Sequence, residues 1–475
     1  MNELRTKEEL LGLLRPWGQE HLLRFWDSLA PSGRERLAAQ IRAIDWPVFH
    51  EWIRKYVIQK PVTEIPADLA PAPYYPLKPR DREQAAVYRA AVQTGEELLR
   101  AGKVAGFTVA GGQGTRLGFA GPKGTFPIGV VSGKSLFQLF AEGILRAGEK
   151  YGRPLFWYIM TSPVNDSATR RFFDENDYFG LSREQVRFFP QGVLPAVGFD
   201  GRLILAEPDS LALSPNGHGG SLLALRDSGA LREMAKHGVE HISYWQVDNP
   251  LVTGFDPLFI GLHARTGSDM SSRCLTKTGP FEKLGNFCIT GGRLKIIEYS
   301  DMPEELATAV DAGGRLRFRA GSPAIHVIRR DFIERITGGG LHLPVHRAEK
   351  KVDFVDENGQ LVHPERPNAV KLEMFIFDAL PLARNPLVLE ADREEQFAPV
   401  KNRVGVDSVV TSQALLLARA LRWLEAAGVA VPRTADGTPL CRVELSPRRF
   451  LAPEDVREQA SSLPAPGPGE VKVYE

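Results

Sequence analysis

The sequence predicts an α/β protein built on a mostly parallel β-sheet with helices on both faces. From residue 104 onward, short apolar runs that suit buried strands alternate with stretches whose apolar residues recur at helical spacing, and this alternation is typical of strand–helix–strand units. The 475 residues exceed the ~250–300 at which one core stops growing. We therefore expect a helical amino-terminal region (1–100), a central α/β domain (101–400) and a short carboxyl-terminal region (401–475).

The amino-terminal region is expected to be helical and then extended. Apolar residues in 3–58 follow helical spacing that is interrupted near Pro16 and Pro31, which predicts several short helices. Six prolines between 61 and 79 disfavour helix and sheet and predict an extended crossing segment. Residues 81–101 predict a helix that leads into the first strand.

The elements of the central domain follow from the same periodicities. Strands are predicted at 104–109, 155–160, 186–189 and 241–247. Helices are predicted near 135–149, 166–176 and 221–236. Beyond this domain, 412–427 predicts an amphipathic helix that Gly428 ends, and the last dozen residues are expected to be loosely held.

Composition disfavours several function classes. A net charge of +1 creates no field that attracts nucleic acid or an anionic membrane. No apolar run approaches the ~20 residues that span a bilayer, and the amino terminus lacks the basic start and apolar core of a signal peptide, so a cytoplasmic protein is expected. Cys274, Cys288 and Cys441 show no metal or disulfide spacing, and we expect them to be reduced and buried.

A glycine-rich loop follows the first predicted strand. Gly111, Gly112 and Gly114 allow backbone N–H groups to approach an anion, and Arg116 and Lys123 place two cations beside it. The pattern predicts a polyphosphate site at the carboxyl end of a strand, where ligands of such sheets bind.

The spacing of this loop disfavours two common phosphate-binding folds. Gly112, Gly114 and Gly118 read G-x-G-x-x-x-G, one residue longer than the dinucleotide-binding fingerprint. The sequence 133–135 resembles the end of a Walker A loop, but Ile128 stands where that motif needs its first glycine. An ordinary tight turn is the remaining alternative.

Asp248 is the candidate metal ligand. It closes the predicted strand 241–247, so its carboxylate should emerge at the ligand-binding edge of the sheet. Mg²⁺ accepts one or two carboxylates together with phosphate oxygens, and we therefore expect Asp248 to hold Mg²⁺. The alternative is an Asp-Asn-Pro turn in which Asp248 and Asn249 only cap the backbone.

The motif G-G-x-G-T-R-L-G at 111–118, followed by Pro122 and Lys123, resembles the signature of sugar-nucleotide pyrophosphorylases. Within the UDP-sugar pyrophosphorylase family of UTP–sugar-1-phosphate uridylyltransferases, 346–351 and 367–377 are more similar to the UDP-N-acetylhexosamine branch than to the glucose branch. The resemblance covers about residues 100–405. It implies a Rossmann-like nucleotidyltransferase fold similar to GT-A enzymes and a catalytic, nucleotide- and sugar-binding role for the central domain.

The resemblance also implies roles for individual residues. It assigns catalysis to Arg116, Lys123 and Lys401, metal binding to Asp248, and substrate binding to Gly111, Gly112, Gly114, Thr115, Gln191, His218, Gly219, Gly285, Glu298 and Lys371. Gln191 would pair with the imide edge of uracil, because its amide both donates and accepts. Lys401 would hold the sugar phosphate and Glu298 the sugar hydroxyls. Taken singly, each is as readily an ordinary surface or turn residue.

Two positions leave the sugar open. Relatives typically carry Asn before a histidine where this chain has Ile325, so an expected hydrogen bond to the sugar is missing. His218 occupies a position that is Asn in many acetylhexosamine enzymes and His in the glucose branch. The chain also ends soon after 441–447, so we expect much of the family's small carboxyl-terminal domain to be absent.

The implied activity joins UTP to N-acetylglucosamine 1-phosphate, or another N-acetylhexosamine 1-phosphate, with Mg²⁺, and releases pyrophosphate. The alternatives are a UTP–glucose-1-phosphate uridylyltransferase or a broad UDP-sugar pyrophosphorylase. A UDP-sugar-dependent glycosyltransferase would have little use for Arg116 and Lys123, and a non-catalytic UDP-sugar binder would have lost them. Neither a nucleic-acid nor a membrane partner is expected, and the sequence does not predict the oligomeric state.

Overall fold

The computed structural model describes residues 6–60, 65–340 and 343–475. They divide into two compact units. The small unit comprises Met1–Glu64, Gly192–Ser221 and His342–Asp378. The large unit comprises Ile65–Gln191, Leu222–Leu341 and Ala379–Glu475. Each unit is assembled from segments that are far apart in the sequence.

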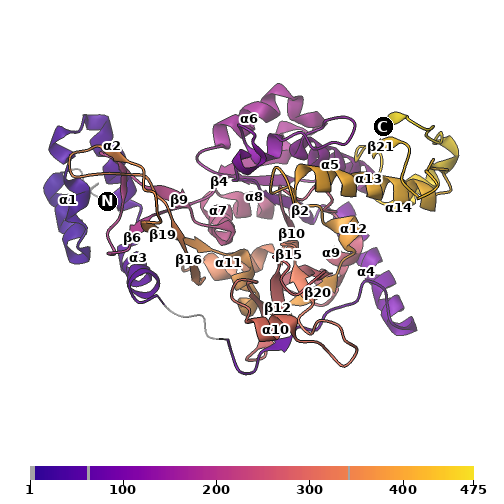
Figure 1. The fold of residues 1–475 in the computed structure, drawn as a ribbon, viewed down its shortest axis with the longest axis horizontal. Helices are drawn as coiled ribbons and strands as arrows, with labels where there is room; N and C mark the ends of the chain where they lie inside the picture. The colour runs from indigo at the N-terminus through magenta and orange to yellow at the C-terminus, as the bar shows by residue number, and fades with distance from the viewer. Residues whose placement is uncertain (1–5, 61–64, 341–342) are drawn as a thin grey trace. The chain divides into compact units, whose positions relative to one another are not determined.

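The large unit is built on an eleven-stranded mixed sheet. Its parallel part, in spatial order, is β10 (His241–Gln246), β2 (Val104–Val109), β3 (Trp157–Thr161) and β4 (Val186–Pro190). Antiparallel pairing with β10 adds β15 (His326–Arg329), which lies beside β10 in Figure 1. The remaining strands are β11 (Met270–Thr276), β20 (Leu387–Glu390), β14 (Ala320–Ser322), β12 (Gly285–Thr290), β13 (Arg293–Ile297) and β1 (Ala70–Pro71). The predicted parallel arrangement is confirmed for β10, β2, β3 and β4, the part of the sheet from which the glycine-rich loop extends.

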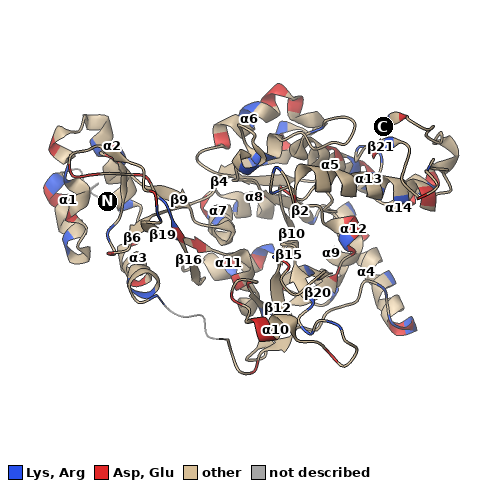
Figure 2. Ribbon diagram, in the orientation of Figure 1, with Lys and Arg blue, Asp and Glu red and all other residues tan. Residues whose placement is uncertain are grey.

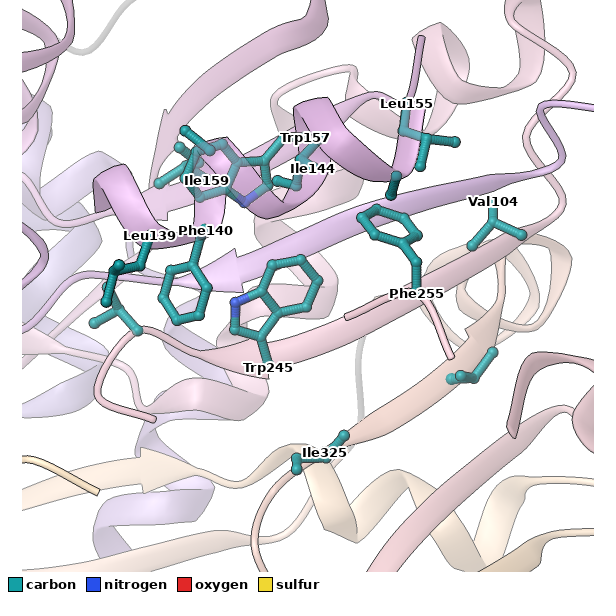
Figure 3. Packing of buried hydrophobic residues seen from close by; sticks show 14 of the residues in the cluster. Val104, Leu139, Phe140, Ile144, Leu155, Trp157, Ile159, Trp245, Phe255 and Ile325 are labelled. Atoms are coloured by element: carbon teal, nitrogen blue, oxygen red, sulfur yellow. The ribbon is translucent and has the colours of Figure 1, made fainter. Parts of the chain in front are cut away.

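The central strands are almost wholly buried, as expected for parallel strands covered on both faces. Aromatic side chains fill the layer between the sheet and α5 (Leu136–Tyr151), and Figure 3 shows Phe140 of α5 beside Trp245 of β10. The one polar group of the Trp157 ring is satisfied by Thr108, at 2.8 Å. This packing fixes the strand ends that carry the candidate site.

Helices flank the sheet of the large unit. They are α4 (Arg82–Arg100), α6 (Asp166–Glu175), α7 (Ser221–Asp227), α8 (Ala230–Lys236), α9 (Pro257–Arg265), α10 (Glu304–Thr308), α11 (Arg330–Thr337), α12 (Arg393–Gln396), α13 (Val409–Ala426) and α14 (Pro453–Glu458). The single helix predicted at 221–236 is two helices, because Gly229 adopts a left-handed φ of +80° between them. Ser135 caps α5 by accepting a hydrogen bond from the Gln138 N–H, which explains the resemblance of 133–135 to a Walker A ending.

The small unit combines short helices with small sheets. Its helices are α1 (Lys7–Leu14), α2 (Pro31–Arg42) and α3 (Trp46–Trp52). Its strands are β5 (Val193–Pro195), β6 (Val197–Gly198), β7 (Leu205–Glu207), β8 (Ser210–Leu211), β9 (Leu213–Pro215), β16 (Val345–Lys350), β17 (Phe354–Val355), β18 (Leu361–Val362) and β19 (Ala369–Met374). The predicted short helices are confirmed, and Pro31 begins α2. Pro61, the first proline of the predicted extended segment, lies outside the described residues.

The carboxyl-terminal end is ordered, contrary to the expectation from the sequence. β22 (Val471–Tyr474) pairs in parallel with β21 (Arg442–Leu445), and Tyr474 is 3% exposed. Local patterning missed this strand because its partner lies far back in the sequence. The predicted helix at 412–427 is confirmed as α13.

Two sequence expectations about chemistry can be checked in the fold. The three cysteines are free and buried, as predicted. No helix in the described part of the chain combines the length and apolar character needed to cross a membrane. Figure 2 shows that acidic and basic residues are interspersed along the elements of both units, in accord with the small net charge.

Two buried histidines should make the fold sensitive to acid. His241 and His263 lie ring against ring at 5.1 Å, and burial lowers the pKa of His241 to about 4 and that of His263 well below its usual value. As the pH falls, these histidines take up protons in the unfolded chain at a higher pH than in the folded protein. The free energy of unfolding should therefore be constant above the ordinary pKa of 6.5 and fall as the pH drops toward 4. His241 alone should account for up to about 3 kcal/mol of unfolding free energy.

Urea unfolding of wild type and of His241→Gln at pH 7.5, 6 and 5 measures this loss. The variant should lose less stability between pH 7.5 and 5, whereas His363→Gln, at an exposed position, should follow wild type. Parallel pH profiles for His241→Gln and wild type would rule out this origin of acid lability.

Candidate active site

The glycine-rich loop after β2 is closed by its own backbone. The Gly114 N–H donates to the Gly121 carbonyl at 2.8 Å, and the Lys123 N–H donates to the Gly112 carbonyl at 3.0 Å. These bonds hold both cationic residues, Arg116 and Lys123, on one compact loop at the carboxyl end of the strand. Gly114 thus shapes the loop with its N–H group.

Other N–H groups of this loop are left available. In the hydrogen-bonded network of the described residues, the N–H groups of Gly111, Gly112, Thr115 and Arg116 donate to no acceptor. An added Cβ at Gly112 would meet no atom within 4 Å, so open space lies beside its backbone. Successive unpaired N–H groups at a strand end form an anion-binding concavity.

Gln191 lies against this loop. It follows β4, is 7% exposed and donates its N–H to the Thr161 carbonyl at 2.9 Å. A Cβ on Gly111 would stand 2.4 Å from the Gln191 Oε1 atom, so only glycine allows the two residues to approach. The structure therefore brings together Gly111 and Gln191, which the sequence assigned to phosphate and base.

Asn165 is a residue that the sequence analysis missed. It is fully buried, accepts from the Ser162 N–H and donates to the Ala110 and Gly112 carbonyls at 3.0 and 3.3 Å. The side chain fastens the segment after β3 to the glycine-rich loop. The available signal was its position just beyond the end of a predicted strand.

Asp248 and Lys123 form an ion pair at the carboxyl edge of the sheet. Their charged groups are 3.6 Å apart, with side-chain exposures of 13% and 14%. The adjacent Asn249 makes the backbone-capping contacts, to Gln396 at 2.7 Å and Ala398 at 2.9 Å. The Asn249 side chain thus bonds the backbone of 396–398 and not its own turn, while the Asp248 carboxylate faces a cation of the glycine-rich loop.

The segment that carries Lys401 is held near the glycine-rich loop by backbone hydrogen bonds. The Val400 N–H donates to the Asp248 carbonyl at 2.8 Å, and the Arg403 N–H donates to the Arg116 carbonyl at 3.1 Å. The Lys401 ammonium lies 3.5 Å from a carboxylate oxygen of Asp407. These contacts bring the segment 400–403 to both the glycine-rich loop and the Asp248 turn.

The two residues assigned to the sugar are also neighbours. Gly285 and Glu298 belong to or follow the paired strands β12 and β13, and a Cβ at Gly285 would lie 3.1 Å from the Glu298 Oε1 atom. The nearest atom to that Cβ would be the Ile296 Cγ2 atom at 2.5 Å, so a side chain at Gly285 would clash with β13 and only glycine allows this approach.

His218 is held as a neutral hydrogen-bond donor in the small unit. Its Nδ1 atom accepts from the Ile376 N–H at 3.2 Å, and its ring stacks on Phe375 with centroids 5.1 Å apart. Burial lowers the pKa of His218 to about 4. The proton of the neutral ring is therefore on Nε2, which can donate to a ligand.

The surroundings of His218 are tightly packed. A Cβ on Gly219 would lie 2.7 Å from the Met374 and Phe375 backbone. His346 stacks on Phe375 at 4.2 Å and bonds the Asp378 carboxylate at 2.8 Å. Lys371 lies in β19, opposite Ala348 of β16. The predicted residues His218, Gly219 and Lys371 thus belong to the small unit, while the phosphate and sugar residues belong to the large unit.

The residues beside the glycine-rich loop fit a metal ion that is bound jointly by the protein and by the phosphates of a substrate. No group of three or more His, Cys, Asp and Glu side chains gathers as a metal site in the described ranges. Asp248 supplies a carboxylate beside Lys123 of the glycine-rich loop, and Mg²⁺ commonly takes one or two carboxylates and completes its shell with phosphate oxygens and water. The donor set suits Mg²⁺ brought in with a polyphosphate.

The open space at Gly112 yields a prediction. Gly112→Ala should leave the fold intact, because the added methyl group meets nothing in the protein, but it should obstruct an anion on the loop and raise the Kd for UTP at least about tenfold. Titration calorimetry with UTP and a thermal unfolding scan test both parts. Gly12→Ala, at an equally open position in α1, is the control that should bind UTP normally. Unchanged affinity in Gly112→Ala would place the anion elsewhere.

Comparisons with known proteins give one consistent family. The model of the UTP–glucose-1-phosphate uridylyltransferase family matches residues 65–465. The chain is 36% identical to the UDP-N-acetylhexosamine pyrophosphorylase-like protein 1 of Homo sapiens, over 94% of this chain and 93% of that protein. It is 36% identical to UDP-N-acetylglucosamine diphosphorylase 1 of Arabidopsis thaliana, over 92% and 89%.

A solved structure extends the similarity to the fold. The uridine diphosphate N-acetylglucosamine pyrophosphorylase of Trypanosoma brucei superposes with a TM-score of 0.81 and 27% identity, covering 99% of this chain and 98% of that chain. The two chains therefore match over nearly their full lengths. Ile325, where the sequence departs from relatives, is 3% exposed and packs in the apolar core (Figure 3).

Proposed function

The chain belongs to the UTP–glucose-1-phosphate uridylyltransferase family and is a nucleotidyltransferase, and from this premise we propose that it forms UDP-N-acetylglucosamine, or another UDP-N-acetylhexosamine, from UTP and the sugar 1-phosphate. The names of the relatives support the acetylhexosamine over the glucose substrate. The observation that carries the proposal is the loop of unpaired N–H groups beside the Lys123–Asp248 pair.

The chemistry is an in-line displacement at the α-phosphorus of UTP. An oxygen of the sugar phosphate forms the new P–O bond, and the bond from the α-phosphorus to the bridging oxygen of pyrophosphate breaks. A phosphate monoester has a second pKa near ~6, so the nucleophile is already anionic and no general base is assigned. The task of the protein is to bring two polyanions together in the right geometry.

The residues of the large unit suit this task. Backbone N–H groups of Gly111, Gly112 and Thr115 receive phosphate oxygens. Arg116 and Lys123 offset the charge on the leaving pyrophosphate, and Lys401 holds the sugar phosphate. Electrostatic stabilisation in a water-poor site is commonly the largest catalytic term, so these cations carry most of the rate in this proposal.

Mg²⁺ bound by Asp248 would neutralise charge that develops on the phosphates. The ion pair between Asp248 and Lys123 orients the carboxylate before substrate arrives. In this proposal Lys123 turns from this carboxylate to a phosphate oxygen when UTP binds.

His218 of the small unit is neutral with its proton on Nε2, and it can donate a hydrogen bond to an oxygen atom without adding a charge. The free, buried cysteines suit a reducing compartment, and we assign the protein to the cytoplasm.

Pyrophosphate release from UTP with a panel of sugar 1-phosphates tests the proposal. With Mg²⁺, kcat/KM should be at least about tenfold higher for N-acetylglucosamine or N-acetylgalactosamine 1-phosphate than for glucose 1-phosphate, a difference of ~1.4 kcal/mol. GTP should replace UTP poorly. A preference for glucose 1-phosphate would overturn the sugar assignment, and absence of pyrophosphate release with every sugar would overturn the activity.

A further inference from the structure

A cavity of about 440 Å³ lies inside the large unit, and we name it the α5–α13 cavity. Its wall is mostly apolar and includes Phe140, Ile144, Phe255, Leu416, Trp423 and Phe450. Volumes of ~300–1,000 Å³ with such linings are typical of small-molecule sites. Neither Arg116 nor Lys123 lines this cavity, so it is distinct from the glycine-rich loop.

Trp245 gives the cavity an unsatisfied hydrogen-bond donor. The residue lines the cavity and is 1% exposed, and its Nε1 atom finds no acceptor within the described part of the chain. Figure 3 shows the indole between Phe140 and Phe255, with the nitrogen on the side of Phe140. A buried N–H group without a partner costs ~1–3 kcal/mol, so an acceptor in the cavity would be stabilised there.

Arg419 gives the cavity a positive charge whose direct hydrogen-bond partners are neutral, with the Glu395 carboxylate acting on it only from beyond ion-pair distance. Its Nη1 atom donates to the carbonyls of Leu251 and Glu395 at 3.1 and 3.4 Å, and no carboxylate among the described residues forms an ion pair with it within 4.0 Å. Burial lowers its pKa to about 10, which leaves it charged at neutral pH. A buried guanidinium with neutral partners favours an anion nearby.

The other charged side chains of the lining are already engaged. Lys150 pairs with Asp455 at 3.0 Å, Glu96 with Arg100 at 2.9 Å, and Glu454 with Arg457 at 3.9 Å. Glu444 accepts from the Val131 and Ser132 N–H groups and the Ser132 hydroxyl. Glu444 thus has its carboxylate filled by three donors but no cation partner, whereas Arg419 bonds protein acceptors among the described residues only through Nη1. The donors left for an occupant are therefore those of Arg419 and Trp245.

We propose that the α5–α13 cavity binds a small amphipathic anion, an aromatic or branched aliphatic body that carries one carboxylate or sulfonate group. The apolar body packs against Phe140 and Phe255. The acidic group pairs with Arg419, and an acceptor atom of the ligand takes the indole N–H of Trp245. This site is separate from the UTP site.

The probe that tests this proposal is 8-anilino-1-naphthalenesulfonate, with N-phenyl-1-naphthylamine as the same ring system without its acid. Fluorescence titration of wild type should show one saturable site for the anion, which UTP does not displace. Arg419→Met should weaken the anion at least tenfold and leave the neutral probe unchanged. Arg433→Met, which removes an arginine that pairs with Glu425 outside the cavity lining, is the matched control and should bind both probes normally.

If the loss of Arg419 disturbs the fold, a second variant that fills the cavity still tests the proposal. A Cβ at Gly143 would meet Pro447 and Leu451 at 3.7 and 3.9 Å, which is ordinary contact, so Gly143→Leu should fold and fill the cavity. It should abolish binding of both probes, while Gly12→Leu, at an open position in α1, should not. Unchanged anion affinity in Gly143→Leu, or no saturable binding to wild type, would overturn the proposal.

Discussion

Lys123→Ala should lower kcat for UDP-sugar formation by about 10²–10³-fold, the loss that follows removal of one preorganised charge donor from a transition state. The ammonium is 14% exposed and 3.6 Å from the Asp248 carboxylate, so little water can replace it. Because the loop is closed by backbone bonds that do not involve this side chain, the variant should unfold at the wild-type temperature. Stopped or continuous measurement of pyrophosphate release gives kcat and KM separately.

A matched ion pair at the opposite ends of the same two strands provides the control. Lys103 and Glu240 precede β2 and β10 and form an ion pair at 2.7 Å, just as Lys123 and Asp248 follow the same two strands. Lys103→Ala should change kcat less than twofold, since a surface pair contributes little. Full activity in Lys123→Ala would remove the catalytic role assigned to this residue.

Asp248→Asn should lower kcat by a similar factor and raise the Mg²⁺ concentration needed for half-maximal rate at least about tenfold. The substitution preserves the shape of the turn, because the Val400 N–H bonds the Asp248 main-chain carbonyl. Titration of activity with Mg²⁺ at fixed UTP separates a binding defect from a rate defect.

Glu240→Gln is the corresponding control and should leave the Mg²⁺ dependence unchanged, because this carboxylate sits at the amino end of β10. A double variant of Lys123 and Asp248 should lose less than the product of the two single losses, since the residues are in contact. An Asp248→Asn enzyme with the wild-type Mg²⁺ profile would contradict the assignment of this carboxylate.

Local signals in the sequence were enough to predict the strand and the glycine-rich loop that form the candidate phosphate site. β2 reads as a buried strand from its apolar run, and the glycine spacing after it marks a backbone that must approach an anion. Asp248 was placed correctly for the same reason, because it closes a strand of the parallel set. Strand ends and glycines depend on neighbours in sequence, so periodicity can find them.

Contacts between residues far apart in the sequence could not be predicted from local patterns. The pairing of Lys123 with Asp248 and the anchoring of the glycine-rich loop by Asn165 depend on how strands are ordered. The small unit joins three separate segments of the chain, which no local pattern encodes. The neutral state of His218 arises from burial and from the Ile376 N–H, and both exist only in the folded chain.

Titration calorimetry with UTP, on wild type and on a variant with both Arg116→Ala and Lys123→Ala, tests the central claim most directly. If the loop after β2 holds the triphosphate, wild type binds UTP at one site and the double variant binds it at least about a hundredfold more weakly with an unchanged thermal unfolding temperature. Equal affinity in the two proteins would contradict the account.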